Sequence, residues 1–347
     1  MRDDHIKLGH GSGGVLTRRL IEETLLRFFT SPRLAPLPDS ACLELDGAAV
    51  AFTTDSYVVD PIFFPGGDIG KLAVFGTVND LAVVGAIPRF ISCALILEEG
   101  LPTSDLEAIL GSMRAAADAA GVEVVTGDTK VVPRGKADKV FINTAGLGLI
   151  PAGAPVPGGQ VQPGDAVLVS GPVGDHGAAV LSRREGLNLE TPVTSDCAPL
   201  TAAAQAVLRA ARRVAFMRDL TRGGLATVLN EATGEGRPAT AEFPLAGRPG
   251  LLLTETAIPV REEVRSLCEV LGLDPLYLAC EGRLAAIVDA ASAQGVVDAL
   301  RDVPGAEQSC IIGEASARYT GKVALQTVLG TRRLLQMLSG EQLPRIC

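Results

Sequence analysis

Tryptophan is absent from this sequence, and aromatic residues make up only 4% of its 347 residues. The core must therefore be built largely from alanine, valine, leucine and isoleucine. With 47% hydrophobic and 20% charged residues, the composition is typical of a folded globular protein. No run approaches about 18 uninterrupted apolar residues, so we expect no membrane partner. The opening MRDDHIKLGHGSGG has no apolar stretch of the signal-peptide kind, which leads us to expect a cytoplasmic protein.

The sequence also lacks paired cysteines and an excess of basic residues. Its seven cysteines are an odd number, widely scattered, with no CxxC pair, which favours neither a disulfide framework nor a zinc site. The six internal cysteines are expected to be small buried hydrophobes in a reducing compartment. The net charge of -9 argues against binding to a nucleic-acid backbone. It leaves room for a nucleotide, because magnesium can bridge carboxylates to phosphates.

The chain length and a run of proline and glycine residues near its middle indicate two domains. The clearest boundary is PAGAPVPGGQVQPGDA (151–166), a run of proline, glycine and polar residues. Strand and helix patterns occur on both sides, which predicts an α+β (α/β) fold of two halves. We expect a glycine-rich segment and helix at 1–40, a first domain at 41–155, a second domain at 156–338 and a mobile tail at 339–347.

Hydrophobic periodicity places the elements. Helices are expected at 16–29, 68–86, 198–212, 222–234 and 260–271, with another opened by a capping box of Ser104 and Glu107. Strands are expected at 49–59, 89–99, 122–128, 139–150, 284–289 and 309–313, with two more inside 322–338 around a turn at Gly330.

Four aspartates of the first half stand in small or glycine-containing turns: Asp46, Asp55, Asp80 and Asp128. A group of such carboxylates is the hard-oxygen shell that magnesium prefers, and magnesium in turn holds ATP phosphates. The alternative is that each aspartate caps nearby backbone N–H groups in a turn. Neither a GxxxxGK[ST] loop nor a kinase signature is present, so an ATP site here must be of another type.

Three further stretches stand out. Lys130 follows Asp128 and is either a solvated loop lysine or a cation aimed at a phosphate or substrate. Arg222 and Gly223 precede an apolar helical pattern, where free N–H groups could bind an anion. The HGSGG of residues 10–14 could close over a ligand. Finally, the chain ends on Cys347, which we expect to be exposed, as chain ends usually are. Arg345 would favour its thiolate and the adjacent terminal carboxylate would oppose it, so the sequence leaves the balance between the two open.

Taken together, these stretches resemble the family of hydrogenase maturation factor HypE. The matching pieces are HGSGG, TTDSYVV, GTVNDLAVVGA, VVTGDTKVV, RDLTRGGLA, the CEG around Glu281, and the terminal GEQLPRIC. The internal motifs are shared in looser form by a wider superfamily of ATP-using enzymes, which includes aminoimidazole ribonucleotide synthetase, selenophosphate synthetase and thiamine-monophosphate kinase. The terminal PRIC separates HypE from these relatives.

The resemblance implies a two-domain fold of the aminoimidazole ribonucleotide synthetase type, in which the N-terminal domains of two chains pair into a dimeric β-barrel core with ATP sites near the interface. It also implies a reaction. A carbamoyltransferase, HypF, loads a carbamoyl group onto the terminal cysteine, and the HypE-type enzyme dehydrates it to a thiocyanate with ATP and Mg²⁺. The cyanide then passes to iron on a HypC–HypD complex, on the way to a nickel–iron hydrogenase.

The resemblance also implies residue roles. The magnesium and ATP ligands would be Asp46, Asp55, Asp80 and Asp128, with Asn79, Arg222 and Gly223 as further nucleotide-binding candidates. Lys130 would orient the carbamoyl group, Glu281 would accept a proton from nitrogen, and Cys347 would carry the reacting group. Asp46 is the weakest candidate, because Gly47 stands where related sequences often carry a second acid. Two alternatives stay open, namely another ATP-using enzyme of the superfamily (a small-molecule kinase, or one like selenophosphate synthetase) and a non-enzymatic maturation scaffold.

Overall fold

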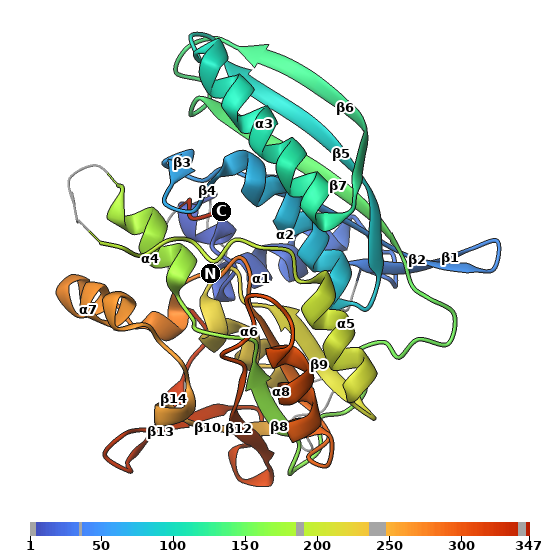
Figure 1. Cartoon of the computed structure of the whole chain (residues 1–347), viewed down its shortest axis with the longest axis vertical. Helices are drawn as coiled ribbons and strands as arrows, with labels where there is room; N and C mark the ends of the chain where they lie inside the picture. Colours follow the sequence, from blue (N-terminus) through green and yellow to red (C-terminus); the bar gives the residue numbers. More distant parts are fainter. Residues whose placement is uncertain (1–4, 35–36, 185–190, 236–247, 339–344) are drawn as a thin grey trace.

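The computed structural model describes residues 5–34, 37–184, 191–235, 248–338 and 345–347. Two large sheets organise the chain, one on each side of residues 151–166 (Figure 1). The first sheet has five strands in the order β1-β2-β7-β5-β6, antiparallel except for the β5–β6 pair. These strands span Ala41–Leu45 (β1), Ala48–Tyr57 (β2), Ile87–Glu98 (β5), Glu123–Val132 (β6) and Val140–Leu149 (β7).

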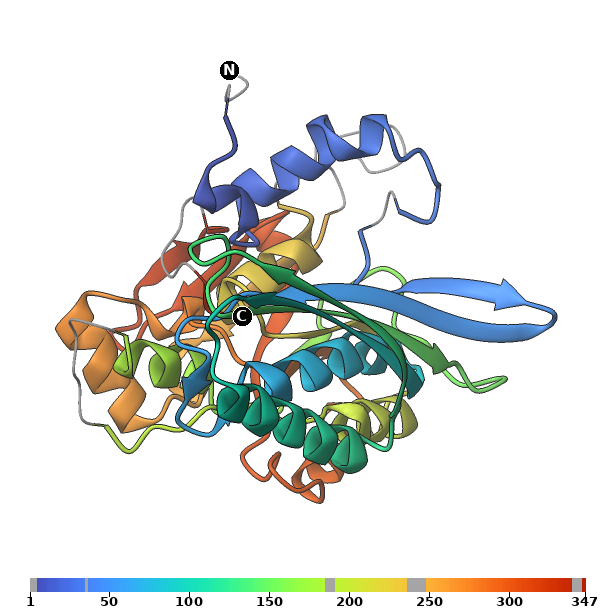
Figure 2. The same ribbon diagram turned by 90° about the horizontal axis from the view of Figure 1, so that it is seen from above.

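Helices α2 (Ile69–Val83) and α3 (Thr103–Ala120) cover one face of this sheet (Figure 2). The N-terminus of α2 is fixed by Asp68, whose carboxylate accepts from two backbone N–H groups of the first turn. This helix is buried on nearly all sides, because it also packs on α5 (Thr201–Ala210) and β9 (Val214–Asp219) of the second domain. It therefore places its polar side chains at the seam between the domains.

The second sheet has seven strands in the order β14-β13-β10-β12-β8-β11-β9. Besides β9, its strands are Ala166–Val169 (β8), Gly250–Thr254 (β10), Leu284–Val288 (β11), Cys310–Ser316 (β12), Val323–Gln326 (β13) and Arg332–Leu335 (β14). The accompanying helices are Asp175–Ser182 (α4), Gly224–Thr233 (α6), Glu262–Leu271 (α7) and Ala293–Arg301 (α8). Strands β8 and β11 are buried at every position, as expected for central strands with both faces covered.

Most of the predicted elements are confirmed, including the two strands around Gly330. The elements that the sequence patterns did not predict include β1, β9, β10 and α8. The predicted capping box of Ser104 is wrong, because α3 already begins at Thr103, with Pro102 as its N-cap and no side-chain capping bond. None of the helices in the described part of the chain has the length and apolar character that a bilayer span requires.

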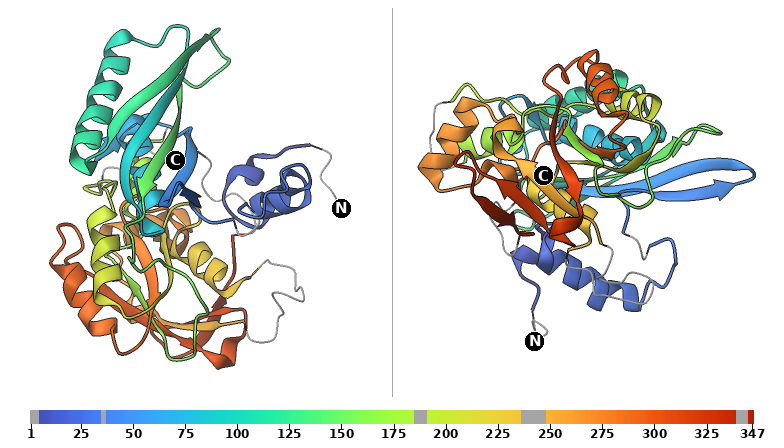
Figure 3. Two further views of the ribbon diagram at one scale, coloured as in Figure 1. Left: turned by 90° about the vertical axis from the view of Figure 1, so that its right-hand side faces the viewer. Right: turned by 90° about the horizontal axis from the view of Figure 1, so that it is seen from below.

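An N-terminal arm projects from the body of the molecule (Figures 2 and 3). Its helix α1 (Val15–Glu23) has no buried residue, and the side chain of Phe28 beyond it is 76% exposed. The β1–β2 hairpin also projects, and its tip is the Asp46-Gly47 pair, both with positive φ. This is the Asp-Gly two-residue turn that favours tight hairpins.

The chain's last three residues depart from the prediction of a mobile tail. Residues 339–344 lie outside the described part, whereas Ile346 and Cys347 are buried in the core of the first domain. The backbone N–H of Val58 donates to the backbone oxygen of the terminal residue Cys347 at 3.2 Å, and that of Asp60 donates to the Arg345 carbonyl at 3.1 Å. Because these bonds extend the end of β2, the C-terminus is held at the seam instead of lying free.

Candidate functional site

Three carboxylates from distant parts of the chain meet at the domain seam. Asp39 precedes β1, Asp80 lies on α2, and Asp219 ends β9. One carboxylate oxygen of each lies within 4.8 Å of the oxygens of the other two. The Thr53 hydroxyl donates to Asp80 Oδ2 at 2.9 Å. We refer to Asp39, Asp80 and Asp219 as the carboxylate cluster.

Burial is the main cause of unusual electrostatics in the carboxylate cluster. Desolvation raises the pKa of Asp39 to about 6 and that of Asp219 to about 8. The pKa of Asp80 is raised well above its usual range by burial and by its two neighbours. Arg218 offsets part of this effect, with its Nε 3.1 Å from Asp39 Oδ2. Crowded carboxylates of this kind suit a divalent cation, which prefers oxygen ligands and would neutralise their charge.

The terminal thiol lies beside Arg222. The guanidinium donates from Nε to Cys347 Sγ at 3.1 Å, and its Nη2 lies 3.9 Å from Asp55 Oδ1. Arg345, whose effect on the thiol the sequence left open, does not make this contact. Arg345 turns away, and its Nη1 lies 2.7 Å from Asp138 Oδ2.

The docked thiol is neutral at physiological pH. The pKa of Cys347 is raised to about 11, mainly by burial. The charges of Glu281 and Asp55 add to this rise, and Arg222 opposes it. The expectation of an exposed terminal cysteine is therefore wrong, since only 8% of this residue is exposed. A thiol nucleophile needs its thiolate form. The docked position consequently suits a sulfur that already carries a group better than one that must attack.

Glu281 faces the same region with unmet hydrogen-bonding capacity. It is 2% exposed, and its Oε1 has no hydrogen-bond partner among the described residues. Burial, followed by the charges of Asp219 and Asp196, raises its pKa well above the usual range. A buried carboxyl with a raised pKa and a free oxygen is a good acceptor for a substrate proton.

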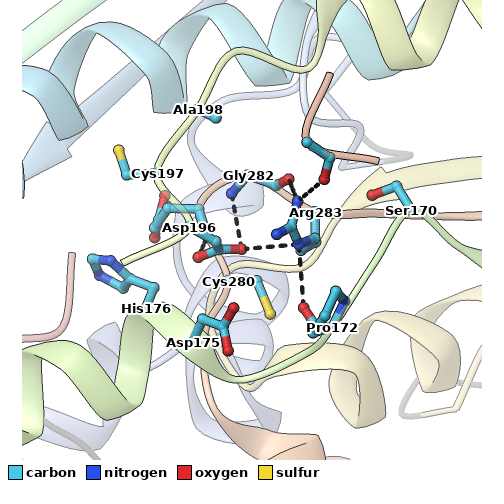
Figure 4. A network of polar contacts seen from close by, with 12 residues as sticks. Ser170, Pro172, Asp175, His176, Asp196, Cys197, Ala198, Cys280, Gly282 and Arg283 are labelled. Atoms are coloured by element: carbon cyan, nitrogen blue, oxygen red, sulfur yellow. Dashed lines mark hydrogen bonds and ion pairs between the residues drawn. The ribbon is translucent and has the colours of Figure 1, made fainter. Parts of the chain in front are cut away.

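A buried polar network around Asp196 and Arg283 (Figure 4) fixes the backbone next to Glu281. Asp196 accepts from the Glu281 N–H at 3.0 Å and from the Gly282 N–H at 3.3 Å. Asp196 also pairs with Arg283, with 3.7 Å between Asp196 Oδ2 and Arg283 Nε. Arg283 in turn donates from Nη1 to the Gly305 carbonyl at 2.8 Å. These contacts hold the backbone of Glu281 in place and so limit where its carboxylate can lie.

Asn79 is part of the same buried network. Its amide atoms are hydrogen-bonded to backbone groups, which argues against a role in nucleotide binding. Its Nδ2 donates to the carbonyls of Ala198 and Glu281, each at 3.1 Å, and its Oδ1 accepts from the Leu200 N–H at 2.8 Å. The residue is completely buried. Asn79 thus ties α2 of the first domain to the Glu281 loop of the second.

Three of the other sequence candidates lie away from the cluster within one chain. Asp46 is an exposed turn residue at the hairpin tip. Asp128 and Lys130 lie on the edge strand β6 and form an exposed ion pair with 2.6 Å between Nζ and Oδ2. Strand register puts them opposite Ala94 and Ile96, on the face of the sheet that the helices leave open.

Gly223 and its neighbour Gly224 start helix α6 with positive φ. A Cβ on Gly224 would lie 2.5 Å from the Leu278 carbonyl oxygen, so this close approach requires glycine. The Gly224 N–H bonds to the Thr221 carbonyl at 2.9 Å. The two glycines therefore allow the tight start of α6 that places Arg222 at the domain seam.

A cavity of about 1010 Å³ opens next to the carboxylate cluster. Its walls include Asp39 and Asp219 of the cluster, Gly13 of the HGSGG stretch, and the side chains of Arg18, Arg218 and Arg222. Such a mixture of cationic, glycine and carboxylate groups fits a polyphosphate ligand with its counter-ion. The volume is ample for a nucleotide.

Sequence reasoning missed two members of the cluster, Asp39 and Asp219. Asp219 follows the β-rich VAFM and precedes a polar turn, the same strand-end signal that singled out Asp55. Asp39 stands in a Pro-Asp-Ser turn, with no local pattern that separates it from an ordinary turn residue.

Comparison with known proteins gives consistent matches. Residues 38–150 match the family "AIR synthase related protein, N-terminal domain", and residues 162–326 match the corresponding C-terminal domain. The chain is 49% identical to carbamoyl dehydratase HypE of Rhodobacter capsulatus, covering 100% of this chain and 99% of that protein. It is 47% identical to carbamoyl dehydratase HypE of Escherichia coli K12, covering 99% and 100%.

Solved structures agree. A hydrogenase maturation protein HypE in complex with ATP superimposes with a TM-score of 0.79 and 49% identity, over 99% of this chain and 100% of that one. A structure of a HypE–HypF complex aligns with a TM-score of 0.83 and 41% identity, over 92% and 99%.

The docked tail predicts slow labelling of Cys347. With iodoacetamide at pH 8, Cys347 should react at least about tenfold more slowly than the exposed Cys42, because it is buried and its thiolate is scarce. The docked pKa of about 11 lies above the ordinary 9.0, so docking should weaken as pH rises between these values. Peptide mass spectrometry measures both. Equal labelling of the two cysteines at pH 8 would contradict the docked position.

Proposed function

This chain belongs to the HypE family of carbamoyl dehydratases, and we propose that it removes the elements of water from an S-carbamoyl group on its own Cys347, with ATP, to leave a thiocyanate. The cyano group would serve the assembly of a nickel–iron hydrogenase. The observation that carries this proposal is the terminal cysteine itself, which lies buried between Arg222 and the region of Glu281, beside a cavity that fits a nucleotide.

The chemistry requires the amide oxygen to become a leaving group. Transfer of the γ-phosphoryl group of ATP to that oxygen turns it into a phosphate, and loss of two N–H protons then closes the carbon–nitrogen triple bond on sulfur. The products are the thiocyanate, ADP and inorganic phosphate. Glu281 is placed to accept a proton, and Arg222 to offset negative charge near sulfur. Holding tail and acceptor together in one buried seam supplies the orientation.

The carboxylate cluster fits a magnesium ion. Its three members present oxygens within 4.8 Å of one another, and burial together with their mutual repulsion raises their pKa values. Asp39, Asp80 and Asp219 would hold the ion, with Asp55 nearby. Bound magnesium would neutralise charge on the ATP phosphates.

Magnesium should stabilise the native chain against heat. At Mg²⁺ concentrations ten times the Kd, the gain is about 1.4 kcal/mol, seen as a rise in Tm by scanning calorimetry. Asp80→Asn should abolish this Mg²⁺-dependent rise, because it removes a charged ligand from the cluster. Asp118→Asn, on the exposed surface of α3, is the control and should keep the rise. An unchanged rise in the Asp80 variant would exclude this cluster as the magnesium site.

We propose a homodimer formed through the open face of the first sheet. That face carries Phe52, Phe90 and Ile96, each more than 40% exposed. Strand β6 is exposed along nearly its whole length, valines included. A second copy covering this face would bury the apolar side chains, and it would bring Asp128 and Lys130 of one chain toward the seam of the other.

Complementation between two variants tests this arrangement. Lys130→Ala and Glu281→Gln should each be nearly inactive alone. When the two are co-expressed, mixed dimers would contain one site with both native residues, and about a quarter of the native activity should return. Co-expression with a tagged copy of each chain allows mixed dimers to be isolated. Mixed dimers that stay inactive would show that Lys130 and Glu281 must come from the same chain.

The proposed partners follow from the reaction. A carbamoyltransferase of the HypF type must load the terminal cysteine, and a HypC–HypD complex carrying iron would receive the cyanide. The seven cysteines, all within the described residues, are unpaired thiols, which supports a reducing cytoplasm.

Mass spectrometry of the intact chain tests the function directly. After incubation with the carbamoylating partner, carbamoyl phosphate and Mg-ATP, Cys347 should gain a carbamoyl group and then lose the mass of one water. Glu281→Gln should still be carbamoylated but dehydrate about 10²–10⁴-fold more slowly. If the added mass stays at carbamoyl in the native chain with ATP present, the dehydratase function fails.

A further inference from the structure

The backbone of the docked tail is hydrogen-bonded to residues of both domains. On one side, the N–H groups of Val58 and Asp60 donate to the backbone oxygen of the terminal Cys347 and to the Arg345 carbonyl. On the other side, the carbonyl between them, that of Ile346, lies 2.8 Å from His176 Nε2. His176, on α4, is completely buried. This contact comes from a side chain, so a substitution can remove it without altering the tail or the strand that holds it.

The protonation of the His176 ring follows from its two partners. A carbonyl oxygen only accepts, so Nε2 must carry the hydrogen and donate to Ile346. Nδ1 lies 2.8 Å from Ser195 Oγ, and that oxygen already accepts from the Cys197 N–H at 3.1 Å. The Ser195 hydroxyl hydrogen is thereby left to point at Nδ1. A neutral ring agrees with its burial, which lowers the pKa of His176.

The ring is also held sterically. Phe64 packs edge-on against it, with 5.2 Å between ring centroids and 89° between planes. The Ser195 N–H donates to the Pro65 carbonyl at 2.8 Å, which anchors the serine to the first domain. Both nitrogens of His176 and its ring face are therefore specified, as expected for a group that must present one donor in one direction.

The stretch that orients His176 also supports Glu281. Ser195 bonds to His176, and the next residue, Asp196, accepts from the N–H groups of Glu281 and Gly282. Figure 4 shows Asp196 beside His176 and its contact with Gly282. The two-residue segment Ser195-Asp196 thus orients both His176, which contacts the tail, and the backbone of Glu281. A displacement of the tail contact would therefore also displace Glu281, and the reverse.

We propose that His176, fixed by Ser195, is a positioning residue that seats the carbamoylated tail for dehydration through its Nε2–H bond to the Ile346 carbonyl. With that carbonyl fixed, Cys347 Sγ is reached by rotation about the bonds of its own residue alone, and it meets Arg222 in the observed position. This inference rests on the proposed function. Carbamoylation, which takes place on a partner enzyme, does not use this seat.

The test compares three variants of the full-length chain. His176→Leu removes the donor, His176→Gln retains an N–H donor, and Ser182→Ala on the same helix removes a buried hydroxyl that bonds only within α4. In His176→Leu we expect Cys347 to be labelled by iodoacetamide about tenfold faster and dehydration of the pre-carbamoylated chain to be about tenfold slower, with carbamoylation not slowed. His176→Gln should lie near the native values, and Ser182→Ala should match them.

Several results would overturn the proposal. Native labelling and dehydration rates in His176→Leu would do so, as would equal losses of carbamoylation and dehydration together with a lowered Tm, which indicate a structural role only. A glutamine variant as impaired as the leucine variant would overturn the donor assignment. If the native chain itself does not dehydrate its tail, the proposed function fails. Labelling of Cys347 would still decide whether His176 seats the tail.

Discussion

Crowding of negative charge at a buried seam is the constraint on which the rest of the site depends. The charge of Asp55 raises the pKa values of the carboxylate cluster and of Glu281, and the charge of Asp219 raises that of Glu281 as well. Like charges in a medium of low dielectric cannot all ionise without a compensating cation. The fold supplies two such groups, Arg218 and Arg222, from the single stretch RDLTRGG that also carries Asp219. A bound divalent cation would complete the balance.

The same constraint determines which form of the tail the seam accepts. Arg222 is shared between Asp55 and Cys347, and a thiolate there would add one more negative charge to a site that already holds too many. The raised pKa of Cys347 expresses this cost. A neutral thiol or a neutral S-carbamoyl group avoids it. The dock therefore favours the tail before it reacts as a nucleophile or after it has been loaded, and the thiolate form belongs outside.

Sequence patterns identified the parts of this site that have a local signature. The strand-end Asp55, the TRGGL helix start and the terminal PRIC could each be found because their neighbours are distinctive. Asp219 could not be assigned, because only the packing of α2 against β9 brings it to Asp80. Asp39 could not be assigned either, because it reaches Asp80 through β2, where the Thr53 hydroxyl contacts both residues. The sequence also could not show that Asp128 and Lys130 face away from Asp55, which depends on strand register across β2, β7, β5 and β6. Asn79 stands beside Asp80, yet one helix turns its amide into the domain seam.

Division of labour between rigid and movable parts follows from these contacts. Glu281 is held by Asp196 from behind and by Asn79 from the other domain, and both supports are buried. An acceptor fixed in this way needs no reorganisation at the moment of proton transfer. The tail, by contrast, is held by the backbone oxygens of its last three residues, by the sulfur contact and by the Arg345 side chain, whose Nη1 lies 2.7 Å from Asp138 Oδ2. Release of the tail breaks these hydrogen bonds and this ion pair and exposes Ile346 and Cys347, whereas displacement of Glu281 would break the seam. The chain end is therefore the part that can travel to a partner, and the seam to which it returns stays ready for it.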